Sequence, residues 1–280
     1  MGKDIRKIPS EGLHNKGCLL SVSVEIMAIG SELCYGRIYD TNSFWIADQL
    51  TRLGAAVQRI TCIPDKLEDI CIVFKEAMKR QPDFIISTGG LGPTFDDLTI
   101  ESLSKVTGRE IITDKEILKS MAERRGTTIE ELSPNLIRMA RTVKGATCLA
   151  NPLGWAPVTI INNGKTVMIA LPGPPREMKA CFKEYVAPLI SRRTRYRSVA
   201  RRVVVKMYES RVSVLTNQIM QEIPAVYMKP LVGEFDPEKG LPIEIVVFAI
   251  NKKECDARMK KAIESLRSLI EEKGGILKVL

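Results

Sequence analysis

The residues best suited to chemistry lie in one short stretch, residues 87–97 (STGGLGPTFDD). Glycines supply positive φ angles at sharp turns, but three glycines, a proline and two threonines exceed what a plain turn requires. The missing side chains would let a phosphate group approach the backbone N–H groups. We therefore predict a phosphate-binding loop, whose substrate-binding residues are Thr88, Gly89, Gly90, Gly92 and Thr94.

Two adjacent acids, Asp96 and Asp97, end this stretch. One acid near a helix N-terminus is explained by the helix dipole, whereas the second is explained poorly. A bound diphosphate carries several negative charges, which a single helix terminus does not compensate. We therefore predict that Asp96 and Asp97 are catalytic residues that bind a divalent cation, either Mg²⁺, Mn²⁺ or Co²⁺.

Other candidate residues follow a predicted first strand at residues 24–29. Glu32 is the third catalytic candidate, and Gly30, Asp40 and Asn42 are further substrate-binding candidates. At the same cleft edge, the polar members of this set could hold metal, a ribose hydroxyl or an attacking water. The only histidine is His14, so the chemistry should rest on carboxylates, hydroxyls, lysines or metal.

Two later loops supply the remaining substrate-binding candidates. Asn151 and Gly154 are the weaker ones, because ordinary helix and turn roles would explain both residues. The second loop precedes a predicted helix at residues 177–190, whose first N–H groups could bind an anion. Its candidates are Pro172, Gly173 and Pro174.

The elements that must position these residues alternate between strand and helix. Hydrophobic patterns predict strands at residues 24–29, 56–63 and 84–87. Helices are predicted between them and again from residue 97, where Thr94 and Asp97 have the spacing of a capping box. This order predicts a parallel sheet with ligands at the carboxyl ends of its strands.

The rest of the chain predicts helices at residues 114–125 and 133–143, and a hairpin of strands 155–161 and 166–171. After residue 198 the order becomes β-α-β-β-α-β, which indicates a ferredoxin-like arrangement. We predict an α/β domain at residues 22–194 and a small α+β domain at residues 198–280. Residues 1–21 are predicted to form a flexible tail.

Composition narrows the possible partners and compartments. Seven of the basic residues that give the net charge of +9 lie between residues 190 and 206. This run favours a solvated linker and strand face over a nucleic-acid site, because almost no aromatic residues interleave with the charges. No apolar run approaches the ~20 residues of a membrane helix. The seven cysteines include no C-x-x-C pair, so we expect a reducing, cytoplasmic location.

Four motifs together resemble the CinA family, a competence/damage-inducible branch of the molybdopterin-binding domain superfamily. The resemblance covers about residues 24–190, and the motifs are GSEL…G…DTN (30–42), TGGLGPTFDDLT (88–99), NPLG (151–154) and LPGPPRE (171–177). It implies a three-layer α/β/α, molybdopterin-binding-like fold with a mostly parallel sheet and a cleft for a pterin or nucleotide diphosphate. A homo-oligomer is also expected, with a dimer favoured.

The resemblance implies two alternative functions. The first is a metal-dependent hydrolase of a nucleotide diphosphate such as ADP-ribose, in effect an ADP-ribose pyrophosphatase. The alternative is a molybdopterin-binding protein without hydrolase activity. The sequence departs from the family at Ser31, where aspartate is usual, and at Trp155 and Val158, which replace threonine and glycine. The nicotinamide-nucleotide deamidase domain of many bacterial members is absent from these residues, so deamidation is not expected.

Overall fold

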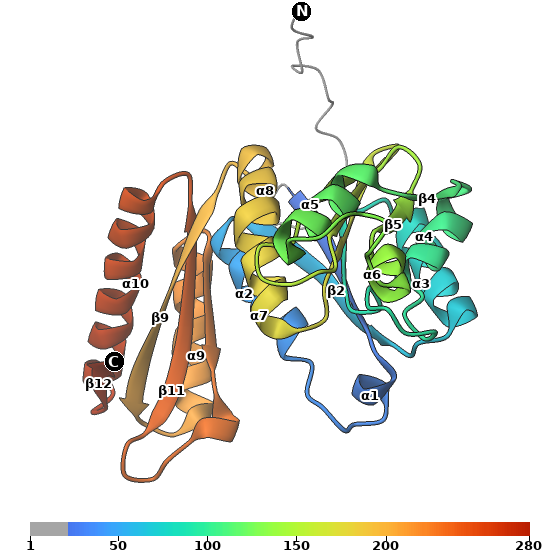
Figure 1. The fold of residues 1–280 in the computed structure, drawn as a ribbon. Coiled ribbons are helices and arrows are strands. Elements are labelled where there is room, and N and C mark those ends of the chain that lie inside the picture. The colour runs from blue at the N-terminus through green and yellow to red at the C-terminus, as the bar shows by residue number, and fades with distance from the viewer. Residues whose placement is uncertain (1–21) are drawn as a thin grey trace, which may run out of the picture. The chain divides into compact units, whose positions relative to one another are not determined.

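The computed structural model describes residues 22–280, so the predicted tail at residues 1–21 lies outside the described residues. The described chain forms two compact units (Figure 1), and their boundary in the sequence falls after Val199, within strand β9 (Arg197–Lys206). The larger unit contains the described residues up to Val199 together with residues 249–252. The smaller unit contains residues 200–248 and 253–280. We keep residues 22–194 and 198–280 as the proposed domains.

A six-stranded sheet forms the centre of the larger unit, in the order β2-β1-β3-β8-β7-β6. Strand β1 pairs in parallel with β2 and β3, and β3 pairs in parallel with β8. Strand β7 is antiparallel to both β8 and β6. The strands are β1 (Val22–Ile29), β2 (Ala55–Ile63), β3 (Phe84–Thr88), β6 (Thr147–Leu149), β7 (Val158–Asn163) and β8 (Thr166–Leu171).

Helices cover both faces of this sheet, which confirms the predicted three-layer fold. On one face, Ile46 of α2 and Phe182 of the π-helical turn η1 pack on β1, β3 and β8. On the other, Phe74 of α3 and Leu103 of α4 pack against the alternate side chains of the same strands. The covering elements are α2 (Thr41–Arg52), α3 (Leu67–Arg80), α4 (Thr99–Thr107), α7 (Pro175–Cys181), η1 (Phe182–Val186) and α8 (Ala187–Arg193).

The segment between α4 and β6 differs from its prediction. Ser133 caps α6 as expected, but the helix ends at Met139, and the predicted helical residues 141–143 form strand β5. This strand pairs with β4, so the β-branched Thr142 and Val143 enter a two-stranded ribbon instead. The elements of this segment and of the loop after β1 are α1 (Ser31–Cys34), β4 (Ile111–Thr113), α5 (Lys115–Arg125), α6 (Pro134–Met139) and β5 (Arg141–Val143).

A buried carboxylate lies in the middle of β1. Glu25 is only 2% exposed, because β1 is covered on both faces. Arg80, at the end of α3, donates two hydrogen bonds of 2.7 Å to its two carboxylate oxygens. These bonds raise the pKa of the Arg80 guanidinium above its ordinary value. Within residues 22–280, the buried Glu25 carboxylate thus has one charged partner, an arginine on a neighbouring helix.

The smaller unit has the β-α-β-β-α-β order that was predicted for it, with a four-stranded sheet in the order β10-β11-β9-β12. Strand β11 alternates between buried and half-buried residues, as expected for a sheet with one face covered by helices. Its further elements are α9 (Glu209–Glu222), β10 (Val226–Pro230), η2 (Val232–Glu234), β11 (Leu241–Ala249), α10 (Lys252–Glu272) and β12 (Ile276–Val279).

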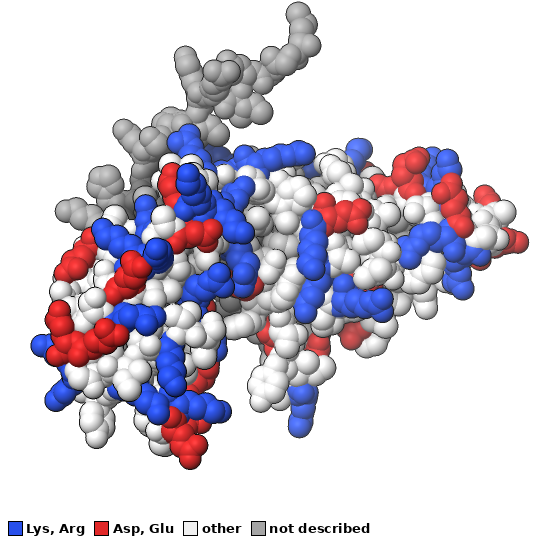
Figure 2. All heavy atoms as spheres, turned by 90° about the vertical axis from the view of Figure 1, so that its left-hand side faces the viewer, with Lys and Arg blue, Asp and Glu red and all other residues white. Residues whose placement is uncertain are grey.

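Two of the basic residues between residues 190 and 206 make contacts within their own unit. Arg202 forms ion pairs with Glu234 at 3.0 Å and Glu244 at 2.6 Å. Arg197 donates hydrogen bonds to Leu53 and other groups of the larger unit. On the face drawn in Figure 2, acidic side chains lie among the basic ones. Among residues 22–280, no helix is both long and apolar enough to cross a membrane.

Candidate functional site

The candidate site is a cavity of about 380 Å³ in the larger unit. Strands β1, β3 and β8 are parallel, so their carboxyl ends meet at one edge of the sheet. The loops that leave these three strands supply most of the lining. Twelve predicted site residues come together there: Gly30, Glu32, Asp40, Asn42, Thr88, Gly89, Gly90, Thr94, Asp96, Asp97, Gly173 and Pro174.

Four predicted site residues do not line this cavity, and several that do were not predicted. Those outside the lining are Gly92, Asn151, Gly154 and Pro172, and those not predicted are Ile29, Leu33, Ile38, Tyr39, Thr41, Asp65 and Pro175. The missed residues are mostly neighbours of predicted ones. Asp65 follows β2, whose parallel pairing with β1 would have placed it at the same edge.

One hydrogen-bond network joins the three loops. The side-chain amide of Asn42 donates to the Thr88 hydroxyl at 3.0 Å and to the Gly173 carbonyl at 2.7 Å. The Thr88 hydroxyl in turn donates to the Pro172 carbonyl at 2.9 Å. Asn42 therefore holds the start of α2 against the ends of β3 and β8. Pro172 does not line the cavity, but its backbone carbonyl is part of this network.

The glycines of the loop after β3 are required by close packing. Gly89 has a φ of +99°, and a Cβ there would lie 2.1 Å from the Ile29 carbonyl oxygen. A Cβ on Gly90 would lie 2.4 Å from the Thr99 hydroxyl, which donates to the Gly89 carbonyl at 2.8 Å. Close packing alone therefore explains why glycines occupy these two positions. Gly90 also keeps a backbone N–H that makes no hydrogen bond within residues 22–280, so an anion could still bind there.

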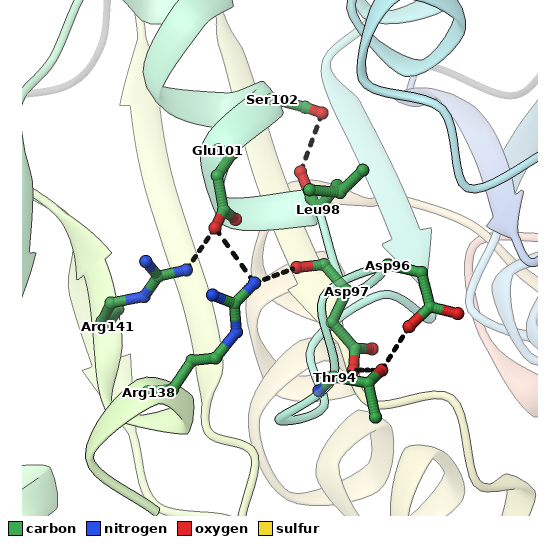
Figure 3. Close-up of polar contacts among 8 residues, drawn as sticks. All are labelled: Thr94, Asp96, Asp97, Leu98, Glu101, Ser102, Arg138 and Arg141. Carbon is green, nitrogen blue, oxygen red and sulfur yellow. Dashed lines mark hydrogen bonds and ion pairs between the residues drawn. The ribbon is translucent and has the colours of Figure 1, made fainter. Parts of the chain in front are cut away.

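The two adjacent acids share one hydroxyl, as Figure 3 shows. The Thr94 hydroxyl lies 2.6 Å from Asp97 Oδ2 and also contacts Asp96 Oδ1. A hydroxyl has one proton and can donate to only one carboxylate at a time. The hydrogen bond from Thr94 lowers the pKa of Asp96 below its ordinary value.

The predicted helix start at residue 97 is wrong. The backbone N–H of Thr94 donates to Asp97 Oδ2 at 2.8 Å, so the expected capping contact closes a turn that precedes the helix. Helix α4 begins at Thr99 instead, and Leu98 in the N-cap position makes no side-chain cap. Both acids therefore belong to a loop, which leaves their carboxylates at the cavity.

We expect Thr94→Val to raise the pKa of Asp96 toward its ordinary value, because the donated hydrogen bond is lost while the side-chain shape is kept. A depressed carboxyl pKa contributes stability above the unfolded pKa, which is lost as pH falls through the folded pKa. In the variant the folded and unfolded pKa values of Asp96 lie closer together, so this pH-dependent contribution should be smaller. A carboxyl NMR titration of both proteins measures the change, and an identical Asp96 titration in the two would contradict it.

Arg138 ties the acid loop, which carries Asp96 and Asp97, to Glu101 of α4 (Figure 3). Arg138 of α6 donates to the Asp97 carbonyl at 3.1 Å and to Glu101 of α4 at 3.2 Å. Arg141 of β5 also pairs with Glu101. The side chains of Arg138, Arg141 and Glu101 are each less than one-third exposed. No motif indicated these residues, because the network depends on β5, which was predicted as helix.

The charged side chains that line the cavity are all acidic. Its lining includes five carboxylates, and none of the described residues that line it is Lys, Arg or His. Asp65 accepts from the Ser31 N–H at 2.6 Å, and Asp40 caps α2 by accepting from the Ser43 N–H at 2.9 Å. Asp96 and Asp97 are each bonded to Thr94 through one carboxylate oxygen. Glu32 and the second carboxylate oxygens of Asp96 and Asp97 could bind a ligand or cation.

The cavity offers carboxylate oxygens, which are the ligands that a hard divalent cation prefers. No group of three or more His, Cys, Asp or Glu side chains that could hold a metal occurs among residues 22–280. Mg²⁺, however, is commonly held by one or two carboxylates, with waters and substrate phosphates as the other ligands. Asp96 and Asp97 fit that second kind of site, but not a cage built entirely from protein.

The loop with Asn151 and Gly154 has a structural role. The Asn151 side chain is buried, donates to Glu177 at 2.7 Å and accepts from the Gly154 N–H at 2.9 Å. The neighbouring Trp155, which departs from the family motif, stacks under Arg124 with 4.5 Å between the guanidinium carbon and the ring centre. These contacts shape the loop and do not reach the cavity lining.

The three-layer fold with a glycine-containing loop at the strand ends is the arrangement expected of a molybdopterin-binding type of domain. Residues 25–192 match the family model described as "probable molybdopterin binding domain". The chain belongs to this family, in its CinA-like branch.

Individual relatives agree with this assignment. A protein of Pyrobaculum calidifontis is 37% identical over 252 residues, which cover 89% of this chain and 95% of that protein. A CinA-like protein of Thermosipho melanesiensis is 40% identical over 159 residues, or 57% of this chain and 39% of that protein. The crystal structure of CinA from Thermoplasma acidophilum has a TM-score of 0.56 and 33% identity, and covers 60% of this chain and 97% of that one.

Proposed function

We propose that the cavity binds a small phosphate-bearing ligand of the pterin or nucleotide class, with molybdopterin as the first candidate. The observation that carries this proposal is the cavity at the ends of β1, β3 and β8 in a domain of the molybdopterin-binding family. Its volume of about 380 Å³ is that of a small-molecule site. The unpartnered N–H of Gly90 would donate to a phosphate oxygen.

The same cavity should bind an anionic ligand only together with a cation. Unit charges of like sign about 4 Å apart repel by roughly 4 kcal/mol at the effective dielectric near a protein surface. A phosphate ligand among five carboxylates and no basic lining residue therefore needs compensation. Asp96 and Asp97 would hold a divalent cation, which when bound would neutralise phosphate charge.

The second candidate function is metal-dependent hydrolysis of ADP-ribose or a similar nucleotide diphosphate. The specific observation in its favour is that Glu32, Asp96 and Asp97 lie in one cavity without competing basic residues. Glu32 is exposed and would accept the proton of an attacking water. Family membership supports ligand binding, whereas hydrolysis rests on these three carboxylates alone.

The two candidates are separated by calorimetry and by product analysis. Wild-type protein is titrated with molybdopterin and with ADP-ribose, each with and without Mg²⁺, and ADP-ribose is assayed for release of AMP. Binding of either ligand supports the proposed site, and binding of neither would reject it. Turnover of ADP-ribose would establish the second candidate, whereas saturable binding without turnover would leave the pterin-binding function alone.

We expect Mg²⁺ to strengthen the binding of the phosphate ligand in the wild type. The double variant Asp96→Asn with Asp97→Asn should lose at least ~10-fold of that enhancement, because the amides keep the shape but carry no charge. Asp48→Asn is the matched control, since Asp48 lies on α2 in an exposed ion pair with Arg52 and outside the cavity lining. Equal Mg²⁺ dependence in the double variant and the control would exclude the metal role of the acid pair.

If ADP-ribose is hydrolysed, Glu32→Gln should lower kcat by about 100- to 10 000-fold while the Kd changes little, because only proton transfer is removed. Single-turnover assays at saturating ADP-ribose measure this directly. Wild-type kcat in Glu32→Gln would assign the base to another group.

A further inference from the structure

Large apolar side chains are exposed where the chain passes from β1 into α2. Four residues within ten positions have exposed fractions above one half: Tyr35 (68%), Ile38 (60%), Tyr39 (91%) and Phe44 (78%). Single exposed apolar residues are ordinary, whereas a gathered set usually marks a binding surface. Of these four, Ile38 and Tyr39 also line the cavity. The cavity therefore has an apolar, aromatic part besides its carboxylates and glycines.

The backbone that carries Tyr39 is held in place. Its carbonyl accepts a hydrogen bond of 2.8 Å from the Thr41 N–H, and the next residue, Asp40, is the cap of α2. The preceding loop is tied to α1 by a bond of 2.9 Å from the Arg37 N–H to the Glu32 carbonyl. The aromatic ring is thus exposed although its main chain is ordered by neighbouring bonds. A preorganised aromatic surface of this kind suits a stacking partner.

We infer that Tyr39 is the stacking platform for a planar heteroaromatic ring of the ligand, and so sets a preference for ring-bearing diphosphates over diphosphate alone. This inference rests on the proposed function, because it places the phosphate end of the ligand at Gly90 and its ring at Tyr39. Stacking needs the ring face of Tyr39 and not its hydroxyl, since bases stack on aromatic faces whatever their hydrogen-bonding edges. Leu33 and Ile38 would cover the apolar edge of the same ring.

The test compares two ligands that share a diphosphate but differ in the ring. ADP-ribose and inorganic pyrophosphate are titrated, with Mg²⁺, into the wild type, Tyr39→Ala and Tyr39→Phe. Tyr39→Ala should weaken ADP-ribose binding by about 5- to 150-fold, the range found for loss of one base–aromatic stack. Pyrophosphate binding should not change, and Tyr39→Phe should bind both ligands as the wild type does. Tyr35→Ala is the matched control, because Tyr35 is exposed in the same loop but does not line the cavity.

Each other result overturns the inference in a distinguishable way. Unchanged ADP-ribose binding in Tyr39→Ala, with pyrophosphate bound by all variants, would reject the stacking role and leave the proposed function standing. Equal weakening of both ligands, together with a smaller species in sedimentation, would mean that Tyr39 contacts a second copy of the chain instead. If the wild type binds neither ligand but does bind molybdopterin, the inference fails and the proposed function stands. If it binds none of the three ligands, the proposed function fails, and the inference fails with it.

Discussion

Arg80→Met will destabilise the larger unit by about 3–5 kcal/mol, the usual cost of removing one partner from a buried ion pair. The reason is the asymmetry of the pair: the Glu25 side chain is 2% exposed, while that of Arg80 is 32% exposed. Without Arg80 a carboxylate remains in the centre of the sheet without its two hydrogen bonds. The converse variant Glu25→Gln should cost less, because the remaining guanidinium can reach water.

Urea unfolding followed by tryptophan fluorescence measures this effect, since Trp45 and Trp155 are the only two tryptophans and both lie in the larger unit. Lys144→Met is the control, because the ion pair of Lys144 with Glu110 is more than 70% exposed on both sides and should contribute at most ~1 kcal/mol. Adding Glu25→Leu to Arg80→Met should recover stability, since no buried charge remains. A cost for Arg80→Met no greater than that of the control would show that the pair is not a stabilising contact.

Gly89→Ala will destabilise the same unit by about 2–5 kcal/mol and will weaken ligand binding. The estimate adds about 1–2 kcal/mol for a side chain at positive φ to about 1–3 kcal/mol for an overpacked site. The overpacking arises because the new Cβ would meet the carbonyl oxygen of Ile29 in the adjacent strand, and backbone cannot move as a flexible side chain can. Any relaxation would separate the ends of β1 and β3, and with them the two sides of the cavity.

Gly126→Ala separates these two costs. Gly126 also has a positive φ, +64°, at the end of α5, but a Cβ there would meet nothing within 4 Å. This control should therefore lose only the conformational cost of about 1–2 kcal/mol and keep wild-type binding. Equal destabilisation by the two alanines would show that the close approach of Gly89 to β1 has no energetic consequence.

The architecture of both units was predictable because it follows from local patterns. Strand β3 has five consecutive buried residues, and a short run without charged residues in the sequence indicates this directly. The strand–helix alternation then required parallel pairing, and the smaller unit followed from its order of elements in the same way. Parallel pairing also predicted the gathering of Glu32, Asp40 and Asp96 at one edge, although these residues are up to 64 positions apart.

The errors arose where a local pattern fitted two structures. Thr94 and Asp97 have capping-box spacing, and their contact does form, but it closes a loop turn instead of starting a helix. The predicted helix extends to residue 143 because the end of a helix is weakly marked in sequence, whereas pairing with β4 places residues 141–143 in a strand. Both choices depend on partners distant in sequence, which no local pattern contains.

Residue types and their order thus sufficed for the fold class, the edge of the sheet that holds the cavity, and the identity of four of its five acids. Tertiary packing alone decided three further features. It set the buried pairing of Glu25 with Arg80, the support of the acid loop by Arg138, and the exposure of Tyr39 beside the cavity. The physical reason is range: strand and helix periodicity is a property of neighbouring residues, whereas burial, charge compensation and steric contact depend on segments brought together only by folding.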